Sequence, residues 1–131
     1  MSDGRLPVRV YWEDTDAGGV VYHASYLRFM ERGRTELLRA KGIDQGALLA
    51  ESGLSFVVAK MDIGFRSPAK LDDALDVLTE LRQVGGASLV LRQAVVRAGQ
   101  VLVEAGVTCA LISREGRPAR MPAGLRAKLQ S

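Results

Sequence analysis

Hydrophobic positions near the start of the chain alternate with other residues. Within residues 8–12, the side chains that would share one face are Val8, Val10 and Trp12. A spacing of two is typical of a β-strand with one face against a core. Acidic residues and the pair Gly18-Gly19 follow and interrupt the alternation. We therefore predict a first strand over residues 8–12 and a loop after it.

From residue 24 onward the spacing changes to three and four. The stripe within residues 24–41 consists of Tyr26, Met30, Gly33 and Leu37, flanked by Leu27 and Leu38. This is the period of an α-helix that buries one face. A glycine inside a helix costs roughly 1 kcal/mol, so Gly33 in the stripe predicts a close approach to a sheet. A shorter helix is predicted over residues 44–51, with Asp44 as its N-cap.

The second half of the chain returns to a spacing of two. The alternating runs predict strands over residues 54–65, 75–84, 87–97 and 100–113. Gly85-Gly86 and Ala98-Gly99 separate consecutive runs, and such pairs are typical of hairpin turns. A last short helix is a candidate at residues 122–129.

This order of elements predicts an α+β fold, in which one long helix packs on a curved five-stranded antiparallel sheet. The 131 residues contain no linker or low-complexity segment, so we expect a single domain over residues 1–131. One helix leaves the sheet edges and a flank uncovered. Self-association is therefore expected.

Composition narrows the classes of protein that fit. A hydrophobic fraction of 47% with 25% charged residues is ordinary for a globular protein, and no apolar run predicts a signal peptide or a membrane span. A single cysteine favours a reducing, cytoplasmic location. With one histidine and one cysteine, no metal site is expected. The net charge of +3 comes from scattered residues rather than a basic helix, so nucleic acid is not an expected partner.

The chemistry is concentrated in residues 13–23. This segment contains carboxylates, the two glycines Gly18-Gly19, which have no side chains, and the start of the long helix. The first turn of a helix has N–H groups without partners and a partial positive charge. Such a turn can hold the oxygen of a carbonyl while a carboxylate acts on the carbon or on a water molecule. The arrangement suits acyl transfer, although Asp16 alone is also compatible with a turn-capping role. Cys109, inside an alternating strand, is expected to be a buried hydrophobe.

Two segments carry a resemblance to a known family. The run Glu13-Asp14-Thr15-Asp16-Ala17-Gly18-Gly19-Val20-Val21-Tyr22-His23-Ala24-Ser25-Tyr26-Leu27 resembles the motif of the hydroxybenzoyl-CoA thioesterase family of the hotdog fold, in its Tol–Pal-associated acyl-CoA thioesterase branch. A second run, Ile63-Gly64-Phe65-Arg66-Ser67-Pro68-Ala69-Lys70-Leu71-Asp72-Asp73, is similar to another family segment. With the strand order, the resemblance extends over nearly the whole chain.

The resemblance implies hydrolysis of an acyl-CoA thioester, with a short aliphatic or aromatic acyl group, and no cofactor. It implies that Asp16 is the nucleophile or general base, and that the amide of His23 polarises the carbonyl while its imidazole is supporting or structural. The residues expected to contact substrate are Gly19, Val20, Tyr22, Tyr26, Arg66 and Lys70. From the residues themselves, Tyr22 and Tyr26 are most simply interpreted as core or interface aromatics. A homodimer or homotetramer is implied, with a link to an acyl carrier protein or the cell envelope.

Two other functions stay open at this point. One is a hotdog hydratase or dehydratase, which needs a histidine paired with a carboxylate. The other is a non-catalytic acyl-CoA-binding protein. Release of free thiol from an acyl-CoA distinguishes the thioesterase from both.

Overall fold

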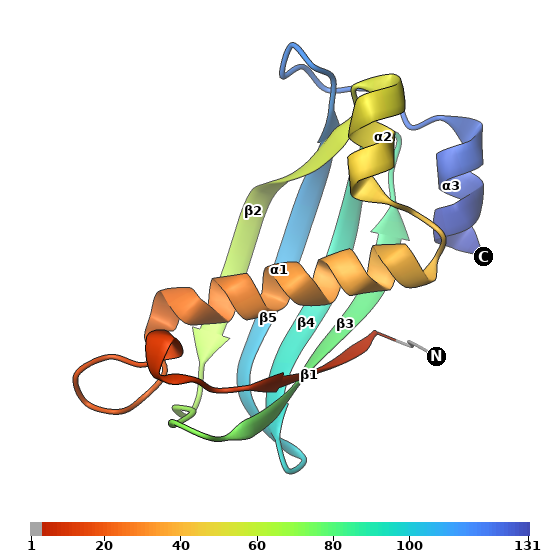
Figure 1. Ribbon diagram of the computed structural model, residues 1–131. Helices are drawn as coiled ribbons and strands as arrows, with labels where there is room; N and C mark the ends of the chain where they lie inside the picture. The colour runs from red at the N-terminus through yellow and green to blue at the C-terminus, as the bar shows by residue number, and fades with distance from the viewer. Residues whose placement is uncertain (1–3) are drawn as a thin grey trace.

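A computed structural model describes residues 4–131. The elements, in chain order, are β1 (Arg5–Arg9), the 3₁₀ helix η1 (Trp12–Asp14), α1 (His23–Ala40), α2 (Gln45–Ser52), β2 (Ser55–Phe65), β3 (Ala74–Val84), β4 (Ser88–Arg97), β5 (Gln100–Ile112) and α3 (Ala123–Gln130). Figure 1 shows these elements, with α1 crossing one face of the sheet.

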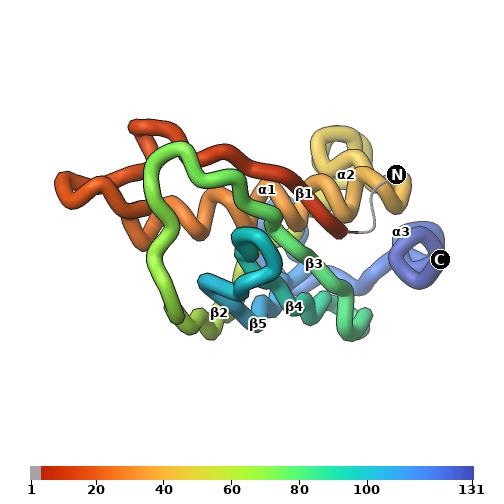
Figure 2. The backbone as a smooth tube through the Cα atoms, turned by 90° about the horizontal axis from the view of Figure 1, so that it is seen from below, coloured from red at the N-terminus to blue at the C-terminus, as the bar shows by residue number. Residues whose placement is uncertain are grey.

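The five strands form one antiparallel sheet in the order β1-β3-β4-β5-β2. Strands β1 and β2 are therefore its two edges. The view from below shows the strands passing around α1, from β2 on one side to β1 on the other (Figure 2). A curved sheet of this kind buries the apolar face of a single long helix.

The core lies between α1 and the inner face of the sheet. Its fully buried side chains include Phe29, Met30, Leu91 and Val95. A Cβ atom built on Gly33 would lie 2.8 Å from both Thr79 Oγ1 and Val77 Cγ1 on β3. The close approach predicted from a glycine in the helical stripe is confirmed.

Most predicted elements agree with the structure to within a residue at each end. Asp44 caps α2 as expected, because its Oδ1 accepts a hydrogen bond from the Ala47 N–H at 3.1 Å. Ala98 and Gly99 both have positive φ, 49° and 81°, which is the conformation of a two-residue hairpin turn. The fold is confirmed, with the two short helices α2 and α3 beside the long one.

The predicted boundaries of the first strand are wrong. Strand β1 runs from Arg5 to Arg9, and Trp12 begins η1 instead of ending the strand. Val10 is fully buried as expected, but Trp12 is 75% exposed. The chain turns at this point because the carboxylate of Asp14 accepts the N–H of Tyr11 at 2.9 Å. The Val10 N–H still donates to the Asp73 carbonyl at 3.0 Å, so pairing with the segment before β3 ends at Val10.

Candidate active site

The loop between η1 and α1 closes on itself. Thr15 and Val21 form an isolated antiparallel bridge, and the Asp16 N–H donates to the Val20 carbonyl at 2.9 Å. Gly19 sits at the tip with φ of 79°, a conformation that favours glycine. The acidic and glycine residues of the motif therefore form a tight loop that ends where α1 begins.

Asp16 lies on the outside of this loop, and its side chain is exposed. Its Oδ1 accepts the Gly18 N–H at 2.8 Å, so the turn-capping interaction considered from the sequence is present. Within the described chain, Oδ2 has no hydrogen-bond or ion-pair partner. One carboxylate oxygen thus orients the group, and the other faces solvent.

The first turn of α1 has no side-chain cap. Tyr22 is its N-cap residue. Its side chain accepts no cap bond, whereas its carbonyl accepts the Ser25 N–H at 2.8 Å. As the first helical residue, His23 has an N–H that no carbonyl of the helix can accept. The positive end of the helix dipole therefore lies where the loop that holds Asp16 ends.

The imidazole of His23 contacts aromatic rings. Its centroid lies 4.5 Å from the ring of Tyr22 and 6.5 Å from the ring of Phe65, the latter edge to face. In the part of the chain that the structure describes, the imidazole has no hydrogen bond to Asp16. The two residues do not form an acid–base pair here.

A second loop, residues 66–73, lies against the first. The Val21 N–H donates to the Ala69 carbonyl at 2.8 Å, and Val20 bridges to Lys70. The buried hydroxyl of Tyr26 accepts the Ala69 N–H at 3.0 Å, which ties this loop to α1. Burial raises the pKa of Tyr26, against the opposing effect of that hydrogen bond. Tyr26 therefore serves as a core residue that holds the two motif segments together.

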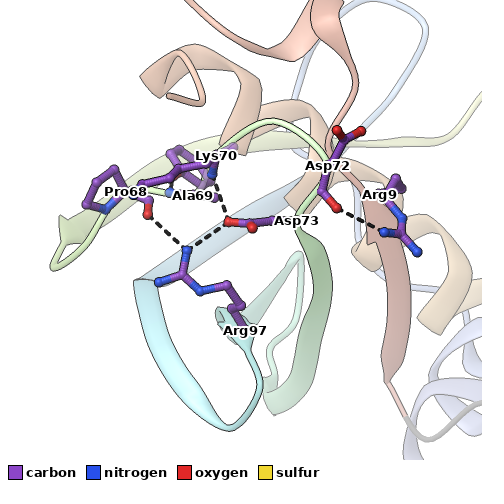
Figure 3. A network of polar contacts seen from close by, with 8 residues as sticks. Arg9, Pro68, Ala69, Lys70, Asp72, Asp73 and Arg97 are labelled. Atoms are coloured by element: carbon purple, nitrogen blue, oxygen red, sulfur yellow. Dashed lines mark hydrogen bonds and ion pairs between the residues drawn. The ribbon is translucent and has the colours of Figure 1, made fainter. Parts of the chain in front are cut away.

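Figure 3 shows the polar contacts that hold the second loop in place. Asp73 Oδ2 accepts the Lys70 N–H at 2.8 Å and forms an ion pair with Arg97 Nη1 at 2.7 Å. Partial burial acts to raise the pKa of Asp73, but these two contacts outweigh it and lower that pKa below its ordinary value. The backbone on either side of Lys70 is thereby fixed.

The two cations predicted to bind substrate differ in their surroundings. Arg66 pairs with Glu104 at 2.7 Å, so its charge is already compensated. Lys70 is exposed and, within residues 4–131, its ammonium group has no ion-pair or hydrogen-bond partner. Lys70 therefore differs from Arg66 in having no direct partner, although its charge helps to lower the pKa of Asp73.

Cys109 is buried, as expected from the sequence. Burial raises the pKa of its thiol, although nearby Arg34 acts in the opposite direction. A thiol that resists ionisation is a poor nucleophile. Its position on β5, beneath α1 and α2, also separates it from the Asp16 loop.

Sequence reasoning missed the contacts of two residues at this site. Phe65, at the end of β2, packs beside Tyr26 with ring centroids 5.8 Å apart, as well as beside His23. Asp14 is 4% exposed and lies 3.6 Å from the guanidinium of Arg28. The contacts of Phe65 could not be predicted because the residues it touches are distant in sequence. Asp14 and Arg28 are visible in the sequence as two separate charges, and nothing in their spacing indicates that they pair.

A long helix enclosed by a five-stranded antiparallel sheet, with a carboxylate loop at the helix start, defines a hotdog-fold protein. Residues 10–129 match the family model described as Thioesterase-like superfamily. The chain therefore belongs to this superfamily, and the predicted family and fold are confirmed. No helix within residues 4–131 is long and apolar enough to cross a membrane.

Individual relatives agree with this assignment. The acyl-CoA thioester hydrolase YbgC of Escherichia coli O6:H1 is 54% identical over 99 residues, which cover 76% of this chain and 73% of the relative. The acyl-CoA thioesterase YbgC of Haemophilus influenzae is 50% identical over 107 residues, covering 82% and 79%. A crystal structure of a probable thioesterase from Bartonella henselae superposes with a TM-score of 0.86 at 42% identity, covering 90% of this chain and 98% of that one.

Proposed function

We propose that this protein hydrolyses acyl-CoA thioesters to a free acid and coenzyme A, and that the acyl group is short and aliphatic or aromatic. The names of the E. coli and H. influenzae relatives support the class of substrate. The observation that carries the proposal is local. The exposed carboxylate of Asp16 lies on a loop that is closed onto the uncapped first turn of α1.

The proposed chemistry uses these two groups together. Asp16 takes a proton from a water molecule whose oxygen attacks the carbonyl carbon, or attacks that carbon itself to form an acyl-aspartate that water then hydrolyses. The His23 N–H donates to the carbonyl oxygen as negative charge develops on it. The C–S bond breaks and coenzyme A leaves as a thiolate, which is stable enough to leave without a general acid.

We assign the contacts to the substrate to residues of the Asp16 loop and of the second loop, residues 66–73. Lys70 is the cation we assign to a phosphate of coenzyme A, because its ammonium group has no ion-pair partner within residues 4–131 and Val20 of the Asp16 loop bridges to its backbone. Gly19 and Val20 present backbone to the acyl group, and the half-exposed ring of Tyr22 forms a wall. Arg66 is the weaker candidate, since Glu104 already neutralises it.

The proposal is tested with a panel of acyl-CoA substrates and a reagent that detects free thiol. We expect thiol release with at least one short aliphatic or aromatic acyl-CoA. Loss of enoyl-CoA absorbance without thiol release would instead indicate a hydratase or dehydratase. Tight binding without either change would indicate a non-catalytic acyl-CoA-binding protein.

We also propose that the protein is a homodimer or homotetramer. Strand β2 pairs with β5 on one side only, and Val57 and Val58 on this edge strand are 39% and 46% exposed. An unpaired edge with apolar side chains is a surface on which a second copy can add its own strand.

Light scattering after gel filtration tests this association. We expect the mass of two or four chains for the natural protein. Val58→Lys places a charge on the β2 edge and should shift the mass toward one chain. Leu49→Lys, on α2 and equally exposed at 46%, is the matched control and should leave the mass unchanged. A natural protein that elutes as a single chain would contradict the proposal.

Three further expectations stay predictions. They are a link to an acyl carrier protein or the cell envelope, a cytoplasmic location, and a single domain over residues 1–131. The last is supported by the single sheet and the single hydrophobic cluster that the described residues form.

A further inference from the structure

Asp14 has surroundings that its position in a surface turn does not explain. It belongs to η1, two residues before Asp16, and only 4% of it is exposed. Burying a carboxylate is costly unless it is hydrogen-bonded and paired with a charge. Here Oδ2 accepts the Tyr11 N–H at 2.9 Å, and Oδ1 lies 3.6 Å from Arg28 Nη2.

The backbone of Asp14 is held as firmly as its side chain. Its carbonyl oxygen accepts the Tyr22 N–H at 2.9 Å and the Ser25 hydroxyl at 3.1 Å. Arg28 Nη2 donates to the same Ser25 Oγ at 2.9 Å. Asp14, Ser25 and Arg28 therefore form a connected cluster that joins the turn before the loop to the first two turns of α1.

The position of this cluster in the chain gives it a consequence for Asp16. The chain leaves Asp14, passes through the loop, and returns to the Asp14 carbonyl at Tyr22. His23, the first residue of α1, is the next residue along the chain. Any shift of Asp14 relative to α1 thus changes the position of the Asp16 carboxylate relative to the His23 amide.

We propose that Asp14, paired with Arg28, is a positioning residue for the hydrolysis reaction. It acts by fixing the Asp16 loop against the start of α1, and so rests on the function proposed above. Arg28 has an electrostatic role in addition, because an uncompensated carboxylate close to the helix start would repel a developing oxyanion. Positions of reacting groups that differ by about 1 Å can change a rate on the order of 10²-fold.

The first test compares Asp14→Ala, Asp14→Asn and Glu13→Gln in steady-state hydrolysis of the best acyl-CoA of the panel. Asp14→Ala removes both carboxylate contacts and should lower kcat about 10²-fold, with KM changed less than about threefold. Asparagine keeps an acceptor for the Tyr11 N–H and should restore part of that loss. Glu13, the exposed neighbour in η1, is the matched control, and its neutralisation should leave kcat unchanged.

A merely structural role predicts a different pattern. Thermal unfolding and gel filtration give the folded fraction of each variant. The proposal would be overturned if Asp14→Ala had a lower unfolding temperature but a normal kcat per folded enzyme. A rise in KM at constant kcat would also overturn it. Arg28→Gln, at a side chain that is 51% exposed, provides a second variant that should fold and should also lower kcat. An unchanged kcat in this variant would remove Arg28 from the proposal.

A double variant separates this proposal from the function on which it rests. If Asp14 acts through Asp16, adding Asp14→Ala to Asp16→Asn should cost less than about a further threefold in kcat. A full additional loss would show an independent effect and contradict positioning. Normal turnover of Asp14→Ala together with a defective Asp16→Asn would leave the proposed function intact and reject only the role of Asp14.

Discussion

Asp16→Asn is expected to lower kcat for acyl-CoA hydrolysis by about 10²–10⁴-fold. The substitution removes the negative charge and the basicity on which either form of the mechanism depends. It should not disturb the fold, because asparagine keeps an oxygen that accepts the Gly18 N–H and the side chain is exposed. Thiol release measures the rate, and circular dichroism with thermal unfolding measures the fold. A variant as active as the natural enzyme would remove Asp16 from the mechanism.

His23→Ala tests whether the imidazole takes part in the same reaction. It removes the imidazole but keeps the backbone N–H to which we assign the oxyanion contact. Loss of such a donor costs on the order of 3 kcal/mol in transition-state stabilisation, so a variant that spares it should retain measurable turnover. If turnover is abolished while the fold is normal, the imidazole takes part in the reaction.

Gly33→Val is expected to lower the free energy of unfolding by roughly 3 kcal/mol. A side chain at this position meets Thr79 Oγ1 and Val77 Cγ1 at 2.8 Å and Gln93 Nε2 at 3.2 Å. Gln93 is buried and donates to the Met30 carbonyl of α1 at 2.9 Å, so the neighbours cannot move without losing hydrogen bonds. Urea denaturation followed by circular dichroism measures the change.

The matched control for this prediction is Gly124→Val in α3. A Cβ atom there meets nothing within 4 Å, so only helix propensity changes. We expect the free energy of unfolding to change by less than about 1 kcal/mol. Equal destabilisation by both substitutions would mean that the contact between α1 and β3 is looser than its geometry indicates.

Most of the secondary structure could be predicted from the spacing of hydrophobic and turn residues along the chain. The stripe that contains Met30 and Leu37 has the helical period, and α1 begins and ends within one residue of the predicted range. Strands β3, β4 and β5 were predicted nearly as closely, because alternation and turn residues such as Ala98-Gly99 act over short distances. The resemblance of residues 13–27 also pointed to the right family.

The first strand shows where local pattern fails. Val8, Val10 and Trp12 alternate correctly, yet Trp12 points into solvent. The alternation ends early because the Asp14 carboxylate accepts a hydrogen bond from the Tyr11 N–H. The same carboxylate forms an ion pair with Arg28, fourteen residues further along the chain. Such a cluster has no periodic signature.

Hydrophobic spacing and turn chemistry act between neighbours in the chain, which is why they predicted the elements and the fold class. The role of Asp16 came from the resemblance of its motif and stays a prediction. The arrangement around Asp16 depends on pairs that are far apart in sequence. Examples are the ring of Phe65 beside His23, the hydroxyl of Tyr26 that accepts the Ala69 N–H, and the ion pair of Arg66 with Glu104. Those contacts form only when the sheet curves around α1, because burial and ion pairing depend on distances in space, which spacing along the chain does not encode.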